Sequence, residues 1–167
     1  MTRADTCSLT YRALAAIAER AGAQAVLLGE FLDRPLPRVR TLCCVEAGAV
    51  TDNFSYRTAG DPATELAAAE SLHIASAVQA RYPASFLLKD FAAEAYAAHR
   101  VSFGSSGKLG IVALFWQQPP ASMAEAQVAL ADFAATFTQQ QESWQLEIER
   151  ERANYTIAAY HTLFREY

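Results

Sequence analysis

The sequence predicts an α+β protein in which a sheet is packed between helices, with a long helix at the C-terminal end. Three observations predict this class. Apolar residues recur at helical spacing near the N-terminus, β-like runs come in two separate pairs, and no Gly or Pro follows Ser122. The predicted order is helix, two strands, short helices, two strands and long helix.

Size and charge limit what the chain can do. Its 167 residues suffice for one domain with a core. Hydrophobic residues make up 52% and charged residues 19%, as is usual for a folded globular protein. The formal net charge is −4, and the densest cationic cluster is interrupted by prolines and apolar residues: Arg34, Arg38 and Arg40. This balance argues against nucleic acid as a partner.

Neither a membrane span nor a signal peptide is expected. The longest strongly apolar stretch, Leu109–Trp116, has eight residues, whereas a spanning helix needs roughly twenty. The N-terminal residues lack the apolar core of a signal peptide. The three cysteines, of which Cys43 and Cys44 are adjacent, form a poor disulfide framework and fit a reducing compartment. The sequence therefore predicts a cytoplasmic protein with no membrane partner.

The first elements are a helix and two strands. Helical spacing covers Leu9–Ala21, with Gly22 as its stop, and β-like runs cover Ala25–Phe31 and Val39–Val45. The prolines of Asp33–Pro37 mark a loop between them. Alternation along the second strand predicts one shared face for four side chains: Val39, Thr41, Cys43 and Val45.

The middle of the chain predicts short helices. Asp61 is placed to cap a helix that begins at Pro62 and runs to Glu70, because proline at the first helical position loses no hydrogen bond. Residues 71–81 are ambiguous between helix and strand. Ser85–Ala93, after Pro83, predicts another short helix.

Two further strands and a long helix complete the chain. Ala95–Phe103 and Lys108–Gln117 flank Gly104–Gly107, a loop whose glycines suit a hairpin. A capping box, Ser122 to Glu125, begins the last helix. The β-like runs predict six core residues: Val26, Leu28, Leu42, Ile111, Val112 and Leu114.

Three stretches resemble a branch of the bacterial GAF domains. Phe54-Ser-Tyr-Arg-Thr-Ala-Gly-Asp-Pro62 is similar to the family's F-x-Y-x-x-x-G-T-P. Val78-Gln-Ala-Arg-Tyr-Pro83 is similar to V-Q-x-x-F-P. The segment from Glu94 to Pro120 looks like the family's E-S-Y strand, its turn and its closing strand.

The resemblance implies a GAF-like antiparallel sheet of five or six strands. It implies N- and C-terminal helices on one face, and short helices and a ligand pocket on the other. Residues 1–140 would be the sensory domain and 141–167 a signalling helix. That helix would lead to an output domain of the PAS, histidine kinase or diguanylate cyclase type. The implied function is small-molecule sensing in signal transduction; the alternative is a ligand-free dimerisation scaffold.

Departures from the family pattern limit the classes of ligand that are expected. Asp61 and Ala63 replace a Thr and a frequent Cys around the proline, and the residue set that marks cyclic-nucleotide GAF domains is not found. No cysteine stands at a position that resembles a bilin attachment site. A cyclic nucleotide and a covalent chromophore are therefore both disfavoured, and no cofactor is predicted.

Six residues are candidates for the ligand pocket: Phe54, Tyr56, His73, Tyr82, Tyr96 and His99. Aromatic walls with a few polar tips suit a small organic ligand, although ordinary core packing explains the aromatics as well. Regular alternation in the strand places His99 on the face opposite Tyr96. A satisfied or solvent-facing histidine is the commoner role for His73 and His99.

No catalytic or metal site is predicted. The sequence holds no His-x-x-x-His, no Cys-x-x-Cys and no nucleophile elbow. Some GAF relatives reduce free methionine sulfoxide with thiols, which would make this chain a thiol-dependent redox enzyme. Alternation places Cys43 and Cys44 on opposite faces of their strand, where two thiols cannot cooperate, so core packing is the favoured role for both.

The helices at the two ends of the chain are expected to form a parallel homodimer. The last helix continues past the domain with apolar residues that have nothing in the chain to cover them. Six residues are predicted at the interface: Leu14, Ile17, Phe133, Phe137, Trp144 and Ile148. The seam of that helix is only weakly apolar, so this contact alone would be weak.

Overall fold

A computed structural model of the chain describes residues 3–103 and 107–140. The strands are β1 (Ala25–Leu32), β2 (Arg38–Glu46), β3 (Ala49–Thr51), β4 (Ser55–Arg57), β5 (Ser71–Ile74), β6 (Ala95–Phe103) and β7 (Lys108–Trp116). The helices are α1 (Arg3–Ala21), the 3-10 helix η1 (Pro62–Ala67), α2 (Val78–Arg81), α3 (Phe86–Asp90) and a last helix at 123–140.

The strands form one antiparallel sheet in the order β3-β2-β1-β7-β6-β5, with β4 on the same outer edge of β2 as β3. The long strands β1 and β7 pair at its centre, which brings residues from both ends of the domain together. The sheet has seven strands instead of five or six because β3 and β4, of three residues each, share the edge of β2.

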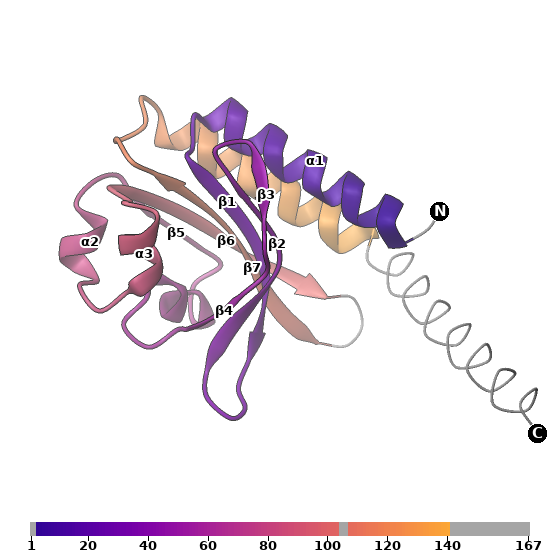
Figure 1. Ribbon diagram of the computed structural model, residues 1–167, viewed down its shortest axis with the longest axis horizontal. Helices are drawn as coiled ribbons and strands as arrows, with labels where there is room; N and C mark the ends of the chain where they lie inside the picture. The colour runs from indigo at the N-terminus through magenta and orange to yellow at the C-terminus, as the bar shows by residue number, and fades with distance from the viewer. Residues whose placement is uncertain (1–2, 104–106, 141–167) are drawn as a thin grey trace, which may run out of the picture.

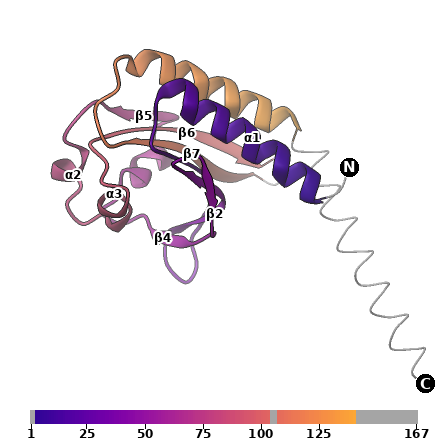
Figure 2. The same ribbon diagram turned by 45° about the horizontal axis from the view of Figure 1, so that its top comes forward.

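Helices cover the two faces of the sheet unequally. Figures 1 and 2 show α1 and the helix at 123–140 side by side on one face, whereas η1, α2 and α3 lie on the other. The two long helices run in opposite directions, so that residues 3 and 140 lie at the same end of the molecule. The predicted α+β class and the division of helices between the faces are confirmed.

A hydrophobic core lies on each face of the sheet. On the helix face, α1 and the last helix bury Leu14, Leu130 and Phe133 against the sheet. On the η1 face, Leu66 and Leu88 pack against Tyr96 and other sheet residues. Burial of each large side chain stabilises the fold by about 1.5–3 kcal/mol. Five of the six predicted core residues are at most 1% exposed: Val26, Leu28, Ile111, Val112 and Leu114.

The sixth, Leu42, is only half-buried because β2 contains a bulge. Leu28 pairs with Cys43 and Gly29 with Thr41, so Leu42 has no partner across the ladder. The carbonyl of Leu42 instead accepts a hydrogen bond from the Asn53 side chain at 3.2 Å. The bulge shifts the alternation by one residue. The prediction of one shared face for all four β2 residues is therefore wrong, since Val39 and Val45 lie in different cores.

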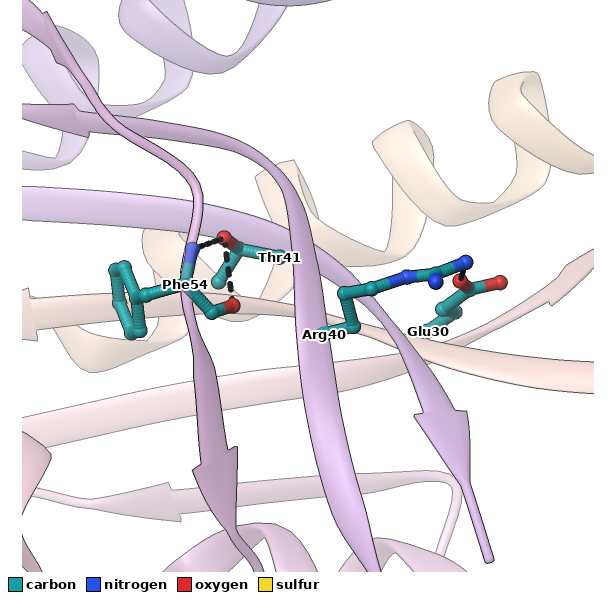
Figure 3. A network of polar contacts seen from close by, with 4 residues as sticks. All are labelled: Glu30, Arg40, Thr41 and Phe54. Carbon is teal, nitrogen blue, oxygen red and sulfur yellow. Dashed lines mark hydrogen bonds and ion pairs between the residues drawn. The ribbon is translucent and has the colours of Figure 1, made fainter. Parts of the chain in front are cut away.

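Thr41 holds the segment after the bulge in place. Its buried hydroxyl accepts a hydrogen bond from the Phe54 amide at 2.8 Å and lies 3.1 Å from the Phe54 carbonyl (Figure 3). One residue along, the Arg40 guanidinium pairs with the Glu30 carboxylate on β1 (Figure 3). The Thr41 contacts fix the position of β4 and of Tyr56, which β4 carries.

The middle segments differ most from the sequence prediction. Asp61 caps the following helix as predicted, but that helix is 3-10 and ends at Ala67. The ambiguous segment 71–81 divides into the edge strand β5 and the single turn of α2. The first helix begins at Arg3 instead of Leu9, since no Gly or Pro interrupts the intervening residues.

Several predictions fall outside the described residues. The centre of the Gly104–Gly107 loop, the whole signalling helix at 141–167, and the interface residues Trp144 and Ile148 belong to this group. Within the described part, no helix combines the length and the apolar character that crossing a membrane requires.

Candidate functional site

Three tyrosines from separate elements meet on the η1 face. Tyr56 lies on β4, Tyr82 is the C-cap of α2, and Tyr96 lies on β6. All three pack in the core of this face. The Tyr96 hydroxyl is buried without a hydrogen-bond partner in the part of the chain that the structure describes, whereas the Tyr82 hydroxyl is buried beside the Glu65 carboxylate. Leaving a buried polar group unpaired costs about 1–3 kcal/mol, so this cluster carries a cost that the fold itself does not offset.

Asp61 organises the polar side of this cluster. It is 3% exposed, its Oδ1 accepts a hydrogen bond from the Ala63 amide at 2.9 Å, and its Oδ2 accepts one from the Ser85 hydroxyl at 2.6 Å. Ser85 in turn accepts from the Leu88 amide at 3.3 Å and caps α3. One carboxylate therefore joins η1 to α3, and both of its oxygens are engaged.

Burial shifts the titration of the whole cluster. It raises the pKa of Tyr96 and of Tyr56 well above the ordinary value, with Asp61 adding to the shift in both. Burial and the nearby Glu65 carboxylate raise the pKa of Tyr82 to about 12. Burial also raises the pKa of Asp61, against the hydrogen bonds from Ser85 and Ala63 that lower it. At neutral pH all three tyrosine hydroxyls are therefore protonated and able to donate.

An ion pair closes the surface over the cluster. The Arg81 guanidinium on α2 lies 3.6 Å from the Glu65 carboxylate on η1. The same guanidinium carbon lies 5.6 Å from the centre of the Tyr82 ring, in cation–π range. Both side chains of the pair are largely exposed, so the pair itself contributes little stability. The pair links η1 to α2.

A cleft of about 630 Å³ opens beside this cluster, on the other side of η1. The ends of β1, β2 and β7 form its floor and rim, and η1 forms its wall. Phe31, Leu66 and Leu109 supply apolar lining. The polar and charged residues of the lining are Asp33, Arg38, Thr58, Thr64 and Lys108. Leu109 is 38% exposed. This volume lies within the range of small-molecule sites, roughly 300–1,000 Å³.

The structure brings four of the six predicted ligand residues together. Phe54, Tyr56, Tyr82 and Tyr96 share the core of the η1 face, and the rings of Phe54 and Tyr56 lie 6.1 Å apart. None of the six lines the cleft. The cleft residues were missed because they come from five separate segments of the chain and share no motif. The position of Asp61 before Pro62 predicts a helix cap but not the hydrogen bond with Ser85.

The two histidines do not join the tyrosines. His99 pairs across the sheet with Val112, which lies in the helix-face core, and its Nδ1 lies 2.7 Å from the Arg100 carbonyl. His73 pairs with Ala97 of the same core and is exposed on the edge strand. Because alternate residues of a strand point to opposite faces, one pocket cannot hold both histidines and Tyr96. Their assignment to that pocket is corrected.

Two predicted interface residues are buried in the chain's own hydrophobic core. Leu14 is 0% exposed and Phe133 is 9% exposed, since both pack against the chain's own sheet. The correction is that neither side chain is available to a partner. Ile17 and Phe137 are partly exposed and pack at the margin of the same core. The apolar stripe of a helix that covers a sheet cannot also cover a second chain.

The thiol of Cys44 shows no sign of activation. Cys44 is 0% exposed in the η1-face core, and burial raises its pKa above the ordinary value. Cys43 lies on the opposite face, as predicted from alternation. A reactive thiol needs a lowered pKa and access to substrate, and Cys44 has neither. Within the described ranges, no group of three or more His, Cys, Asp or Glu side chains is arranged to hold a metal ion.

Comparison with known proteins identifies the fold. No family model matches the sequence, and no curated protein matches it significantly. Among solved structures, a bacteriophytochrome from the photosynthetic bacterium R. palustris has a TM-score of 0.64 at 10% identity over 94% of this chain. A red/green cyanobacteriochrome in its red light-absorbing state has a TM-score of 0.56 at 13% identity over 89% of this chain and 96% of its own.

A third similar structure is the NreA protein of Staphylococcus aureus, mutated in its nitrate-binding site. Its TM-score is 0.54 at 13% identity, over 74% of this chain and 95% of its own. The chain spans only 38% of the bacteriophytochrome. At these identities the likeness concerns the fold alone. The resemblance seen in the sequence motifs is confirmed at that level, and the chain is a GAF-like α+β domain.

Proposed function

We propose that this chain is a sensory domain that binds a small molecule on the η1 face and passes the event to the helices on the opposite face. The observation that carries the proposal is the cleft of about 630 Å³ between η1 and the ends of β1, β2 and β7. It lies on the face that the two long helices leave uncovered. The known structures with this fold include a chromophore-binding protein and a protein with a nitrate-binding site, which supports ligand binding.

A ligand in this cleft would be mostly apolar. The strand side chains that alternation turns toward η1, Phe31 and Leu109, are apolar, and Leu66 on η1 faces them. Thr64 already donates its hydroxyl hydrogen to the Thr58 carbonyl, so the two threonines offer few free donors. We expect an organic molecule with a mostly apolar body, bound in the cytoplasm.

The test is a thermal-shift screen of a metabolite library on the wild-type chain and on Ala67→Trp. Ala67 lines the cleft from η1 and is exposed, so an indole there fills the space without disturbing the core. Ala68→Trp is the matched control, because Ala68 is the exposed next residue and does not line the cleft. A ligand at a hundred times its dissociation constant adds about 2.7 kcal/mol to stability.

The proposal predicts compounds that stabilise the wild type and Ala68→Trp but not Ala67→Trp. Compounds that stabilise all three proteins alike bind elsewhere and contradict the assignment of the cleft. If no compound stabilises the wild type, the domain acts as a ligand-free scaffold, and ligand sensing is abandoned.

Transmission is proposed through α1 and the helix at 123–140, in a homodimer. Beyond its core stripe, the last helix presents Val128, Ala131 and Ala135 to the outside on one line, and Val128 is 55% exposed. Ala13 and Ala16 are exposed on α1. Small exposed side chains let a second helix approach closely. A ligand shifts such a pair only if it binds one helix arrangement more tightly than the other, and an output domain would read that shift.

A further inference from the structure

The hydroxyl of Thr58 is a polar group of the cleft that the fold does not use. Thr58 directly follows β4, lines the cleft and is only 7% exposed. Its backbone is engaged, since its amide donates to the Pro37 carbonyl at 3.3 Å and its carbonyl accepts from the Asp61 amide at 2.9 Å. Its hydroxyl, in contrast, makes no hydrogen bond to any group among residues 10–103 and 107–140.

The cleft keeps this hydroxyl within reach of solvent. The Tyr96 hydroxyl is sealed in the core, whereas the Thr58 hydroxyl is not. Tyr56, two residues earlier, packs in the core of the η1 face, and alternation turns Thr58 toward that same face. Small-molecule sites place a few polar groups among apolar walls. A nearly buried threonine whose hydroxyl still opens into a cleft has the properties of such a group.

Thr64 supplies the complementary group. It lies on η1, lines the same cleft, and donates its hydroxyl hydrogen to the Thr58 carbonyl. Because that hydrogen is committed, the Thr64 oxygen can only accept a further hydrogen bond, whereas the Thr58 hydroxyl still has its hydrogen to donate. The two threonines, joined by their own hydrogen bond, therefore present one donor and one acceptor to the cleft.

This pairing determines which ligand group both threonines can bind. A carboxylate or carbonyl oxygen accepts from Thr58 but has no hydrogen for Thr64, and an ammonium group donates to Thr64 but cannot accept from Thr58. A neutral hydroxyl does both. The Arg38 guanidinium, a cation of the lining, already donates to the Arg34 and Leu36 carbonyls of its own loop.

We infer that Thr58 and Thr64 form the polar end of the cleft and that its ligand is an apolar molecule bearing a hydroxyl group, an alcohol or a phenol. The ligand oxygen accepts a hydrogen bond from Thr58 and donates its own hydrogen to the Thr64 oxygen. The apolar body lies against Phe31, Leu66 and Leu109. This assignment rests on the proposed function and deepens it, because it names the group by which the ligand is recognised.

Three variants isolate the Thr58 hydroxyl. Thr58→Val removes it and keeps the branched shape of the side chain, whereas Thr58→Ser keeps the hydroxyl. Because this hydroxyl has no partner in the described part of the chain, the ligand-free Thr58→Val protein should melt at or above the wild-type temperature. Thr136→Val is the matched control, since Thr136 is exposed on the last helix and does not line the cleft.

The probes are five benzene derivatives of nearly the same size that differ in hydrogen bonding and charge: benzyl alcohol, benzaldehyde, ethylbenzene, benzylammonium and benzoate. Binding is followed by NMR titration of the full chain with alanine and threonine methyl groups labelled, because Ala63 and Thr64 line the cleft in every variant. Benzyl alcohol is expected to bind the wild type most tightly. Thr58→Val should raise its dissociation constant about tenfold, whereas Thr58→Ser and Thr136→Val should leave it nearly unchanged.

The outcomes separate the two proposals. Another probe binding as tightly as benzyl alcohol, no shift with benzyl alcohol, or an unchanged affinity in Thr58→Val overturns the hydroxyl subsite. If library compounds stabilise the wild type and Thr58→Val equally but fail on Ala67→Trp, the cleft remains the ligand site and only this subsite is lost. If benzyl alcohol responds to Thr58→Val but no library compound stabilises the wild type, the subsite stands and the proposed sensing function fails.

Discussion

Asp61 is the single residue on which the arrangement of the η1 face most depends. It caps η1 through the Ala63 amide and holds α3 through Ser85. We expect Asp61→Ala to lower the free energy of unfolding by about 1–2 kcal/mol, because the cap is lost and Ser85 keeps no acceptor. Asp61→Asn, which caps helices equally well and carries no buried charge, should remain near wild type. Urea denaturation of the three proteins measures this, and equal losses in Ala and Asn variants would contradict it.

The buried tyrosines predict a loss of stability at alkaline pH. Their pKa values in the folded chain lie above the ordinary value of 10.0, and that of Tyr82 is about 12. Between pH 10 and these raised values the unfolded chain has released protons that the folded chain retains. Stability is therefore full below about pH 10 and falls as pH rises beyond it. Tyr96→Phe should make that fall shallower in denaturation measured from pH 8 to 11.5, whereas Tyr11→Phe should not.

At the residue scale, the sequence predicts the aromatic members of the site but not the hydrogen bonds among its polar residues. Phe54, Tyr56, Tyr82 and Tyr96 do share one core. The engagement of Asp61 by Ser85 joins residues 24 positions apart, and no local pattern indicates such a contact. His73 and His99 were grouped with the tyrosines by chain position, and the pleat of the sheet separates them.

At the scale of elements, the pairing of β1 with β7 depends on Gly110. A Cβ there would collide with the Phe103 ring and with the Gly29 carbonyl oxygen on β1. We expect Gly110→Ala to cost about 3 kcal/mol or more, since the central strands would have to separate. Adding Phe103→Leu removes the ring but leaves the backbone contact. Recovery of stability in the double variant, measured by thermal unfolding, would show that the backbone approach is not limiting.

The long elements were predictable and the short ones were not. The strands β1, β2, β6 and β7 have eight or nine residues each, which is enough for apolar runs bounded by turn residues to define them. The strands β3, β4 and β5 have three or four residues and show no periodicity of their own. Their position follows from pairing with neighbours. The bulge at Leu42, whose carbonyl accepts a hydrogen bond from the Asn53 side chain, likewise leaves no pattern in the sequence.

At the scale of the whole molecule, the outer face of the last helix predicts self-association. Val128, Ala131 and Ala135 form an exposed line that the chain's own core leaves uncovered. We expect a dimer by sedimentation equilibrium at micromolar concentration, shifted toward monomer by Val128→Glu. Thr136→Glu is the control, because Thr136 is exposed on the same helix away from that line. A chain ending at Gln140 that remains dimeric would place the interface on the globular part, and a monomeric full chain would exclude this mode of transmission.

The central claim is that a ligand bound on the η1 face alters the helices across the sheet. Amide hydrogen exchange of the full chain, with and without a compound whose binding requires an open cleft, tests it most directly. Transmission across the sheet predicts slower exchange in η1 and at the start of β7, where the cleft lies. It also predicts a change in the exchange of α1 and of residues 123–140, which the ligand does not touch. Protection confined to the cleft, with both helices unchanged, would contradict transmission and leave a binding domain without a signal.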